Sequence, residues 1–285
     1  METTNAATPP ASDRPASLIS VITPVYNGSR YLEELIASVQ GQSHPRLEHI
    51  VIDDGSDDDG ATLAVLARYP QVRSWTRPNR GQYATLNEGL AAARGDWICI
   101  ISADDALAST TCLEELVRHA EAAEPLDAAY GRTVLMDSAG APVAGSHRRV
   151  DESAPPWLNR HFLVIHHCSL LVSRKFLVDN GLFFDTSLRF TGDWDWIIRI
   201  LKAGRSRYFD VVVSRYRMHA QQTRQVTRRA ELVAEDRLVL RRHGASVVMH
   251  HLVVNYFRVK KGLAMVADDG LAATVKAVAR FAAKR

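Results

Sequence analysis

Short hydrophobic runs alternate with helical patterns along the first hundred or so residues of the chain. The expected strands cover residues 18–24, 47–52, 72–76 and 96–101, and the expected helices between them cover residues 30–40, 60–68 and 84–93. In the helical segments, hydrophobic side chains recur at the spacing of one helix face. Strands that alternate with helices in this way predict an α/β fold with a largely parallel sheet, covered by helices on both faces.

The pattern is looser in the rest of the chain. Strands are expected at 128–135, 163–172 and 208–213, a polar loop at 137–153, a helix at 192–203, and mostly helical structure at 226–285. Residues 1–17 are rich in Ala, Pro, Ser and Thr and lack a hydrophobic segment, which is typical of a disordered leader. We therefore expect a leader at 1–17, an α/β domain at 18–222 and a helical C-terminal appendage at 223–285.

Composition restricts the class of protein. The three cysteines, Cys99, Cys112 and Cys168, form no CxxC pair, so neither a disulfide framework nor a structural zinc site is expected. No uncharged hydrophobic run reaches about 18 residues, so we expect no helix that spans a membrane. Together these features favour a cytoplasmic location.

Positive charge is concentrated near the C-terminus. Residues 224–285 carry 13 Lys and Arg against 5 Asp and Glu, whereas the whole chain carries 35 against 32. One interpretation is peripheral contact with the anionic inner face of a membrane, or with a lipid-phosphate acceptor. The other is the solvated face of a helix. Because aromatic residues are not interleaved with the basic ones, no nucleic-acid partner is expected.

Pairs of carboxylates end two of the expected strands. Asp53 and Asp54 follow one strand, and Asp104 and Asp105 follow another. Ligands of parallel sheets bind at the carboxyl ends of strands, so these acids are expected to share one edge of the sheet. Such oxygen ligands select Mg²⁺ or Mn²⁺, which complete their coordination with substrate phosphates. The structural alternative is that Asp105 or Ser109 caps the following helix.

Six short motifs carry a resemblance to a known family. They are SVITPVYN (20–27), DDGS (53–56), GQYATLNEG (81–89), SADD (102–105), GDWDW (192–196) and YRMH (216–219). Their order, and their positions at strand ends and helix starts, resemble the family 2 glycosyltransferases of the GT-A fold. The resemblance implies a Rossmann-like, mixed and mostly parallel sheet flanked by helices, with a nucleotide-binding half at 18–125 and an acceptor-binding half at 126–222.

The resemblance also implies a nucleotide-diphospho-sugar donor. Thr23, Pro24 and Tyr26 match the family segment that lies against the base and ribose, and Asp54 matches the acid that accepts from an imide N–H. That role favours UDP or dTDP over GDP. Arg80 matches a basic group beside the phosphates, and a solvent-exposed loop arginine is the alternative.

A divalent cation, Mn²⁺ or Mg²⁺, is a further implication of the resemblance. By the A-D-D form of the family motif, Asp105 is the direct metal ligand, while Asp104 contacts the donor ribose or the metal shell. His219 matches a position near the phosphates or the metal. A purely structural histidine is the alternative for His219.

Asp193 matches the general base of the family, at the start of a helix. Asp195 is the rival base, and helix capping is the structural alternative for Asp193. The resemblance and the aromatic chemistry lead us to expect Trp194 against an acceptor sugar, whereas Trp196 is expected in the core.

His166 and His167 lie in the strand expected at 163–172. Adjacent residues on a strand point to opposite faces, so the two histidines are not expected to bind one metal. Because the family often carries His and Ser here, close to the acceptor, the resemblance implies that His167 is an acceptor contact.

The expected activity is inverting transfer of a sugar to a hydroxyl of a glycan or lipid-linked acceptor, in bacterial surface polysaccharide or glycolipid assembly. Inversion follows from one base and no enzymic nucleophile. A degenerate nucleotide-sugar-binding module is one alternative. A nucleotidyltransferase would need a Gly-rich basic loop that residues 24–28 lack, and a receiver-like domain fits acids on two strands poorly. The donor sugar, the linkage and the oligomeric state are left open.

Overall fold

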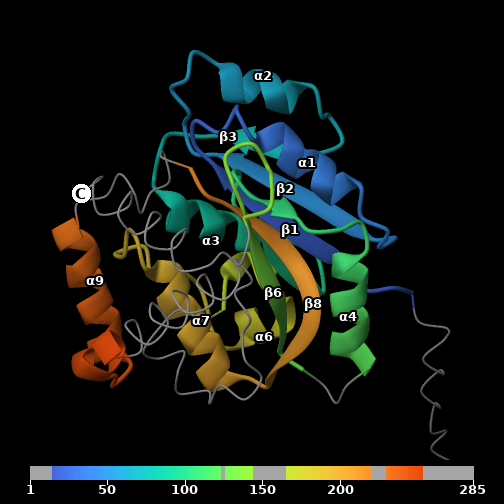
Figure 1. Cartoon of the computed structure of the whole chain (residues 1–285). Coiled ribbons are helices and arrows are strands. Elements are labelled where there is room, and N and C mark those ends of the chain that lie inside the picture. Colours follow the sequence, from blue (N-terminus) through green and yellow to red (C-terminus); the bar gives the residue numbers. More distant parts are fainter. Residues whose placement is uncertain (1–14, 123–125, 144–164, 220–228, 253–285) are drawn as a thin grey trace, which may run out of the picture.

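The computed structural model describes residues 15–122, 126–143, 165–219 and 229–252. Within these residues, one eight-stranded sheet has the strand order β3-β2-β1-β4-β7-β6-β8-β5 (Figure 1). The strands are β1 (Ile19–Val25), β2 (Leu47–Asp53), β3 (Arg73–Thr76), β4 (Trp97–Ile100), β5 (Ala106–Leu107), β6 (Ala128–Met136), β7 (Leu170–Ser173) and β8 (Ser206–Arg217).

Helices cover both faces of this sheet. They are α1 (Leu32–Gln40), α2 (Ala61–Ala67), α3 (Gln82–Ala92), α4 (Cys112–Ala122), α6 (Arg174–Asp179), α7 (Gly192–Ala203) and α9 (Arg229–Arg242), with a 3₁₀ turn, η2 (His167–Ser169). The helices expected in the first half of the chain and at 192–203 are confirmed, with small differences at their ends. The mixed, mostly parallel α/β sheet expected from the sequence is also confirmed.

The first half of the sheet is parallel. Strands β3, β2, β1 and β4 all run in the same direction, and β7 then runs antiparallel to both β4 and β6. The register pairs Val25 with Asp53 and Asp53 with Thr76. The carboxyl ends of β1 and β2 therefore lie side by side, with the end of β4 on the other side of β1.

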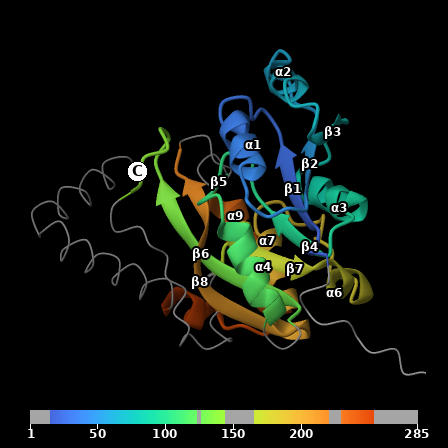
Figure 2. The same ribbon diagram turned by 90° about the vertical axis from the view of Figure 1, so that its right-hand side faces the viewer.

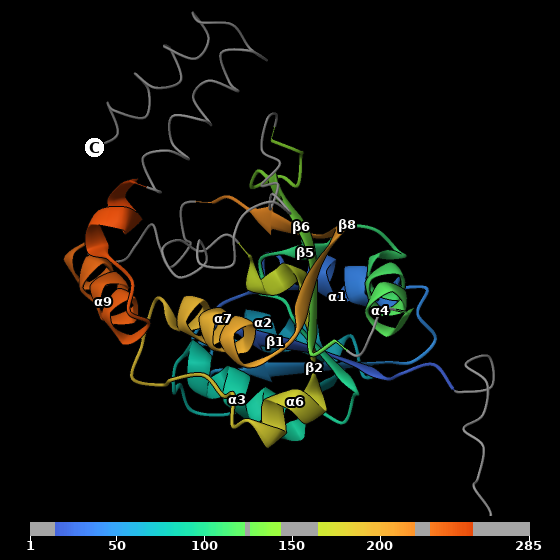
Figure 3. The ribbon, with the colours of Figure 1, turned by 90° about the horizontal axis from the view of Figure 1, so that it is seen from below.

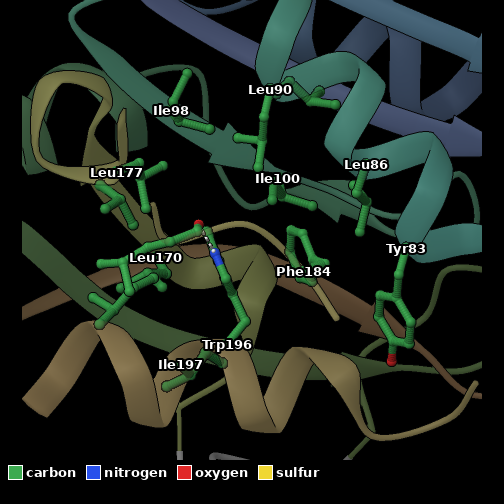
Figure 4. Close-up of a cluster of buried hydrophobic side chains, with 14 of the residues drawn as sticks. Tyr83, Leu86, Leu90, Ile98, Ile100, Leu170, Leu177, Phe184, Trp196 and Ile197 are labelled. Atoms are coloured by element: carbon green, nitrogen blue, oxygen red, sulfur yellow. Dashed lines mark hydrogen bonds between the residues drawn. The ribbon is translucent and has the colours of Figure 1, made fainter. Parts of the chain in front are cut away.

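Each face of the sheet is buried under its own group of helices. Ile22 and Ile50 pack toward α3, α6 and α7, while Val21 and Val51 pack toward α1, α2 and α4 (Figure 2). Figure 4 shows the first of these cores, in which Phe184 lies between α3 and α7. Burial of alternate residues on opposite faces explains why the strands read as continuous hydrophobic runs.

Helix α9 packs on the same core as α3 and α7. Val239 and Leu240 are buried in the cluster that contains Trp196, and α9 lies beside α7 (Figures 1 and 3). Helix α9 thus buries hydrophobic side chains against the α/β domain, and the expected boundary at residue 222, which lies outside the described residues, stays a prediction.

The strand expected at 163–172 is wrong for part of its length. Strand β7 begins only at Leu170, because the preceding residues form η2. Ser169 closes this turn, since its backbone N–H and its hydroxyl both donate to the carbonyl oxygen of His166 at 2.9 Å. Local hydrogen bonds of this kind compete with strand pairing.

Parts of the expected organisation lie outside the described residues: the leader up to residue 14, the loop at 144–153 and the helical segment after 252. In the part of the chain that is described, no helix combines the length and the hydrophobicity that crossing a membrane requires.

His49 of β2 predicts a specific loss of stability in acid. Burial lowers the pKa of its imidazole to about 3, and Nε2 lies 3.1 Å from Thr23 Oγ1. An unfolded histidine titrates near about pH 6.5, so below that pH the unfolded state binds a proton that the folded state does not. As the pH is lowered below about 6.5, the free energy of unfolding should therefore decrease by up to about 1.4 kcal/mol per pH unit, until the pKa of His49 in the folded state is reached.

Urea unfolding near neutrality and at about pH 5 measures this effect. His49→Gln should lose less stability between the two conditions than the wild type does. The exposed His251→Gln is the matched control and should behave as the wild type. Equal acid sensitivity of all three proteins would contradict the assignment.

Candidate functional site

The turn after β2 is built around Asp53. Its carboxylate accepts hydrogen bonds from the Ser56 hydroxyl at 2.5 Å and the Thr76 hydroxyl at 2.6 Å. Gly55, within the turn, has a φ of +74°, a left-handed conformation that favours glycine. Asp53 therefore shapes the turn, and its carboxylate oxygens are engaged by these hydrogen bonds.

Asp54, expected to accept from the donor base, is engaged by the chain itself. Its carboxylate accepts from Arg77 Nη1 at 2.6 Å, the Arg80 backbone N–H at 2.8 Å and the Gly81 backbone N–H at 2.9 Å. The side chain is only 4% exposed. A carboxylate with three charged or amide donors is well satisfied, so Asp54 holds the loop that leads into α3. Its role toward a nucleotide stays a prediction.

The end of β1 divides the expected donor-binding residues into buried and accessible ones. Thr23 is fully buried and its hydroxyl contacts His49, so its side chain belongs to the core, and contact of this segment with a nucleotide stays a prediction. Pro24 is half-buried, and Tyr26 and Arg80 are exposed. These three remain the accessible members of the set.

The two acids after β4 have opposite environments. Asp105 is fully buried, and its carboxylate accepts from the Arg217 backbone N–H at 2.8 Å and from the Cys168 thiol at 3.2 Å. Burial, together with the neighbouring Asp104 carboxylate, raises the pKa of Asp105 well above its ordinary value. Neighbouring carboxylates repel each other when no cation lies between them, so this shift does not decide the metal ligand, and the role of Asp105 as the direct ligand stays a prediction. Asp104, in contrast, is 30% exposed in its side chain and lies 2.9 Å from His219 Nε2.

Arg217 holds this motif in place. Its buried guanidinium donates from Nε to the carbonyl oxygen of Asp104 at 2.8 Å and pairs with Glu34. It also lies 4.5 Å from the ring centroid of Tyr31, and that ring lies 5.1 Å from His219. These contacts fasten the end of β8 to the end of β4 and so bring His219 to Asp104.

Asp104 and His219 form the partly exposed pair of possible cation ligands at this end of the sheet. Carboxylate oxygens are the preferred ligands of Mg²⁺ and Mn²⁺, and an imidazole nitrogen is a common ligand of transition metals. Nδ1 of His219 is buried with no hydrogen-bond partner among the described residues, while Nε2 faces the Asp104 carboxylate, which can only accept a hydrogen bond. A cation bound between the two groups would take the place of this hydrogen bond.

Asp193 lies in the first turn of α7, where three elements meet. Oδ1 is 3.5 Å from the Tyr83 hydroxyl of α3, and Oδ2 is 3.4 Å from Nδ1 of His167 in η2. Oδ1 also accepts from the Trp194 backbone N–H at 2.9 Å. Nε2 of His167 lies 3.1 Å from the Ser102 hydroxyl, which extends the contacts to the end of β4. The Asp193 side chain remains 15% exposed and is thus a partly accessible carboxylate.

Asp195, the rival base, belongs to a buried ionic network. It contacts His243 Nε2 at 2.9 Å and Arg199 Nε at 2.8 Å, and its side chain is 4% exposed. Burial favours a higher pKa, but the hydrogen bonds from His243 and Arg199 outweigh it and lower the pKa of Asp195. Both oxygens are occupied, which leaves Asp193 as the candidate base.

The geometry of η2 corrects the expectation for the two adjacent histidines. The rings of His166 and His167 stack with centroids 5.0 Å apart, instead of pointing to opposite faces. Their possible ligand atoms and Cys168 Sγ all lie within 4.8 Å of one another. However, burial raises the pKa of the Cys168 thiol well above its ordinary value, and this thiol donates to Asp105. The sulfur is therefore protonated rather than a thiolate ligand.

The two tryptophans of α7 are both buried. Trp194 is 2% exposed and its ring lies 5.7 Å from that of His250, so the expectation that it stacks on an acceptor sugar is corrected. Trp196, expected in the core, is confirmed there and donates from Nε1 to the Leu182 carbonyl oxygen at 2.8 Å. Successive residues of a helix point about 100° apart, which lets Asp193 stay accessible while Trp194 is buried.

Three contributors to this arrangement carry little signal in the sequence. Arg77 lies shortly before the GQYATLNEG motif and Tyr83 lies inside it, so nearness to this motif was the only signal of their roles in the sequence. Glu235, which contacts the backbone before α7, lies in a segment without a recognisable motif. All three act through contacts between elements that are distant in sequence.

Fold and site together define a mixed α/β protein in which strand-end acids, a histidine and a helix-borne aspartate belong to one connected set of contacts. The family profile described as glycosyl transferase family 2 matches residues 20–179. The chain belongs to this family of glycosyltransferases. The matched segment runs from β1 to α6 and ends before α7.

Curated relatives agree with this membership. An uncharacterized glycosyltransferase of Rickettsia felis is 30% identical over 213 residues, which cover 72% of this chain and 35% of the relative. One of Rickettsia typhi is 31% identical over 215 residues, covering 72% of this chain and 65% of the relative. Chondroitin synthase of Escherichia coli is 25% identical over 213 residues, covering 72% and 30%. The chain spans about a third of the length of the first curated relatives it matches.

Solved structures share the GT-A fold. TarS (residues 1–349) of S. aureus in complex with UDP-GlcNAc has a TM-score of 0.61 at 19% identity, covering 74% of this chain and 61% of that chain. The mannosyltransferase PcManGT from Pyrobaculum calidifontis, in complex with GDP-Man and Mn²⁺, has a TM-score of 0.53 at 19% identity, covering 94% and 79%. At this identity the likeness establishes the fold.

The close approach of Gly192 to Tyr83 gives a prediction about the site. A Cβ at position 192 would lie 2.6 Å from Cε2 of the Tyr83 ring, which must then move away from α7. Gly192→Ala should destabilise the protein by about 1–3 kcal/mol, the usual cost of overpacking. Urea unfolding measures this, with Gly41→Ala, at an ordinary φ of −77°, as the control of smaller effect.

A second substitution isolates the cause. In a Tyr83→Leu background the ring is absent, so Gly192→Ala should cost less there than in the wild type. An equal cost in both backgrounds would show that the two residues are not in contact.

Proposed function

We propose that this protein is an inverting, metal-dependent glycosyltransferase that moves a sugar from a nucleotide-diphospho-sugar to an acceptor hydroxyl. The observation that carries the proposal is the setting of Asp193. This partly exposed carboxylate contacts Tyr83 and His167, and His167 leads through Ser102 to the strand end that carries Asp104. Family membership supplies the reaction class.

The donor would lie over the ends of β1 and β2. The TarS structure contains UDP-GlcNAc and the PcManGT structure contains GDP-Man, which supports a nucleotide-diphospho-sugar for this chain. The exposed Tyr26 and the half-buried Pro24 would contact the base and ribose, and the exposed Arg80 would contact the pyrophosphate. We propose UDP or dTDP ahead of GDP from the family match of Asp54 to the acid that accepts from an imide N–H; this role requires Asp54 to exchange one of its contacts with Arg77 or with the Arg80 and Gly81 backbone for a contact with the base.

Asp104 and His219 would hold the divalent cation, Mn²⁺ or Mg²⁺. When bound, the cation supplies a positive charge that stabilises the departing diphosphate. Arg217 fixes the Asp104 backbone for this task. Asp105, with its carboxyl group buried, accepts from the backbone N–H of Arg217 and so holds the end of β8 that leads to His219.

Asp193 would take the proton of the acceptor hydroxyl as the new glycosidic bond forms. The Tyr83 hydroxyl and the Trp194 N–H approach Oδ1, while His167 approaches Oδ2, so the orientation of the carboxylate is restricted from both sides. The acceptor would reach Asp193 beside His167. With one base and no enzymic nucleophile, direct attack opposite the diphosphate inverts the anomeric configuration.

For the acceptor we propose a glycan or a lipid-linked sugar, in bacterial surface polysaccharide or glycolipid assembly at the cytoplasmic face of the membrane. Similarity to a chondroitin synthase supports a polysaccharide context. The 13 basic side chains of residues 224–285 support peripheral contact with an anionic leaflet or with a lipid phosphate.

Removal of the proposed base should separate catalysis from binding. Asp193→Asn should lower the rate of sugar transfer by about 10²- to 10⁴-fold, the usual worth of a general base, and leave donor affinity nearly unchanged. Transfer is measured by release of the nucleoside diphosphate, and affinity by titration calorimetry. Asp179→Asn changes an exposed side chain at the end of α6; it is the control and should transfer sugar at the wild-type rate. Full activity of Asp193→Asn would refute the role of Asp193.

Substitution of the two acids after β4 tests the metal site. UDP with Mn²⁺ at 100 times its dissociation constant should add about 2.7 kcal/mol of stability, seen as a rise in Tm. Asp104→Asn should abolish the part of this rise that depends on Mn²⁺. Asp105→Asn preserves the shape of the buried side chain and should retain the Mn²⁺-dependent part of the rise in Tm. The reverse result, in folded proteins, would return the ligand role to Asp105.

A further inference from the structure

Helix α9 grips the backbone immediately before the helix that carries Asp193. Glu235 Oε1 accepts from the Arg189 N–H at 2.8 Å, and Oε2 accepts from the Phe190 and Thr191 N–H groups at 2.8 and 3.1 Å. The Thr191 hydroxyl also lies 3.2 Å from Oε2. Four hydrogen bonds from three consecutive residues thus converge on one carboxylate.

These bonds hold the residues that lead into α7, including the N–H of its N-cap residue Thr191. The N-cap residue Thr191 makes no side-chain hydrogen bond to its own helix, and its hydroxyl is turned to Glu235 instead. The first N–H groups of a helix lack partners within the helix and need them from elsewhere. A negative charge at this end of α7 is also favoured by the helix dipole. The direction in which α7 starts is therefore set by a residue of α9.

A second contact joins the two helices just beyond Asp193. His243, which directly follows α9, contacts Asp195 at 2.9 Å, and Lys202 contacts the other nitrogen of His243 at 3.1 Å. Between the two contacts, the buried Val239 belongs to the core beneath α7. Positions 235, 239 and 243 are spaced by four residues and so share one face of the helical segment.

We propose that Glu235 is a positioning residue for Asp193. It fixes residues 189–191 on the N-terminal side, His243 fixes Asp195 on the C-terminal side, and Asp193 is held between them at its distance from Tyr83 and His167. This inference rests on the proposed role of Asp193 as the base. It makes α9, which lies outside the segment matched by the family profile, part of the catalytic architecture.

The role predicts a selective kinetic defect. All four hydrogen bonds of Glu235 go to residues 189–191, whereas the proposed donor-binding residues lie at the ends of β1 and β2 and in the following loop. Glu235→Gln keeps the size of the side chain but turns an NH₂ group toward backbone donors. Because small displacements of a catalytic group are costly, kcat should fall about 10- to 100-fold, with the dissociation constant for UDP and Mn²⁺ unchanged.

The experiment compares Glu235→Gln with Glu231→Gln, a matched change at an exposed position of the same helix. Hydrogen exchange by mass spectrometry follows the peptide containing residues 189–195, with the peptide of β2 as internal reference. Exchange at 189–195 should accelerate in Glu235→Gln alone, while the β2 peptide is unchanged. Thr191→Val removes one of the four hydrogen bonds and should give a smaller change of the same kind.

The outcomes separate the two levels of the proposal. Wild-type exchange at 189–195, or an unchanged kcat, in folded Glu235→Gln would overturn the positioning role. Equal loss of kcat and of UDP affinity would overturn it too, since that indicates a general structural defect. Absence of sugar transfer by the wild type would instead refute the proposed function, and the exchange rates would still decide whether Glu235 holds residues 189–191.

Discussion

The structure depends on the neutralisation of negatively charged side chains at one edge of a parallel sheet. Carboxylates at strand ends repel one another, so each needs donors or a cation. The chain itself supplies donors to three of these carboxylates. Asp53 accepts from hydroxyl groups, and Asp54 accepts from an arginine and backbone amides. Asp105 accepts from a backbone amide and a thiol. Asp104 is left partly exposed and paired with a histidine. The satisfied acids shape the loops, and Asp104 keeps an exposed side beside His219.

The same division separates the two aspartates of α7. Asp195 is enclosed by Arg199 and His243, and in this way it serves the packing of α7 against α9. Asp193, two residues earlier, has looser contacts of 3.5 and 3.4 Å with Tyr83 and His167 and keeps some exposure. Burial and short ionic contacts thus distinguish the structural carboxylate of Asp195 from the partly exposed one of Asp193.

The site is assembled from elements that the chain supplies far apart. Helix α3, turn η2, helix α7 and the ends of β4 and β8 are joined by Tyr83, His167, Ser102 and Arg217 (Figure 4 shows Tyr83 extending from α3 toward α7). Helix α9 completes this assembly from outside the matched family segment. Helix α9 and the following His243 are therefore coupled to the proposed base through packing and hydrogen bonds.

The sequence by itself determined the alternation of strands and helices, the parallel half of the sheet and the family, because hydrophobic periodicity and motifs at strand ends are local properties. It also placed α7 correctly, since its apolar spacing and its cap region are contained in a dozen residues. Only the tertiary structure decided that Asp105 is buried while Asp104 is partly exposed, that Thr23 and Trp194 face the core, and that Asp54 is held by Arg77. Adjacent residues such as Asp104 and Asp105 are chemically identical in the sequence. What separates them is the approach of Cys168 and the Arg217 backbone from distant strands and turns, which no local pattern records.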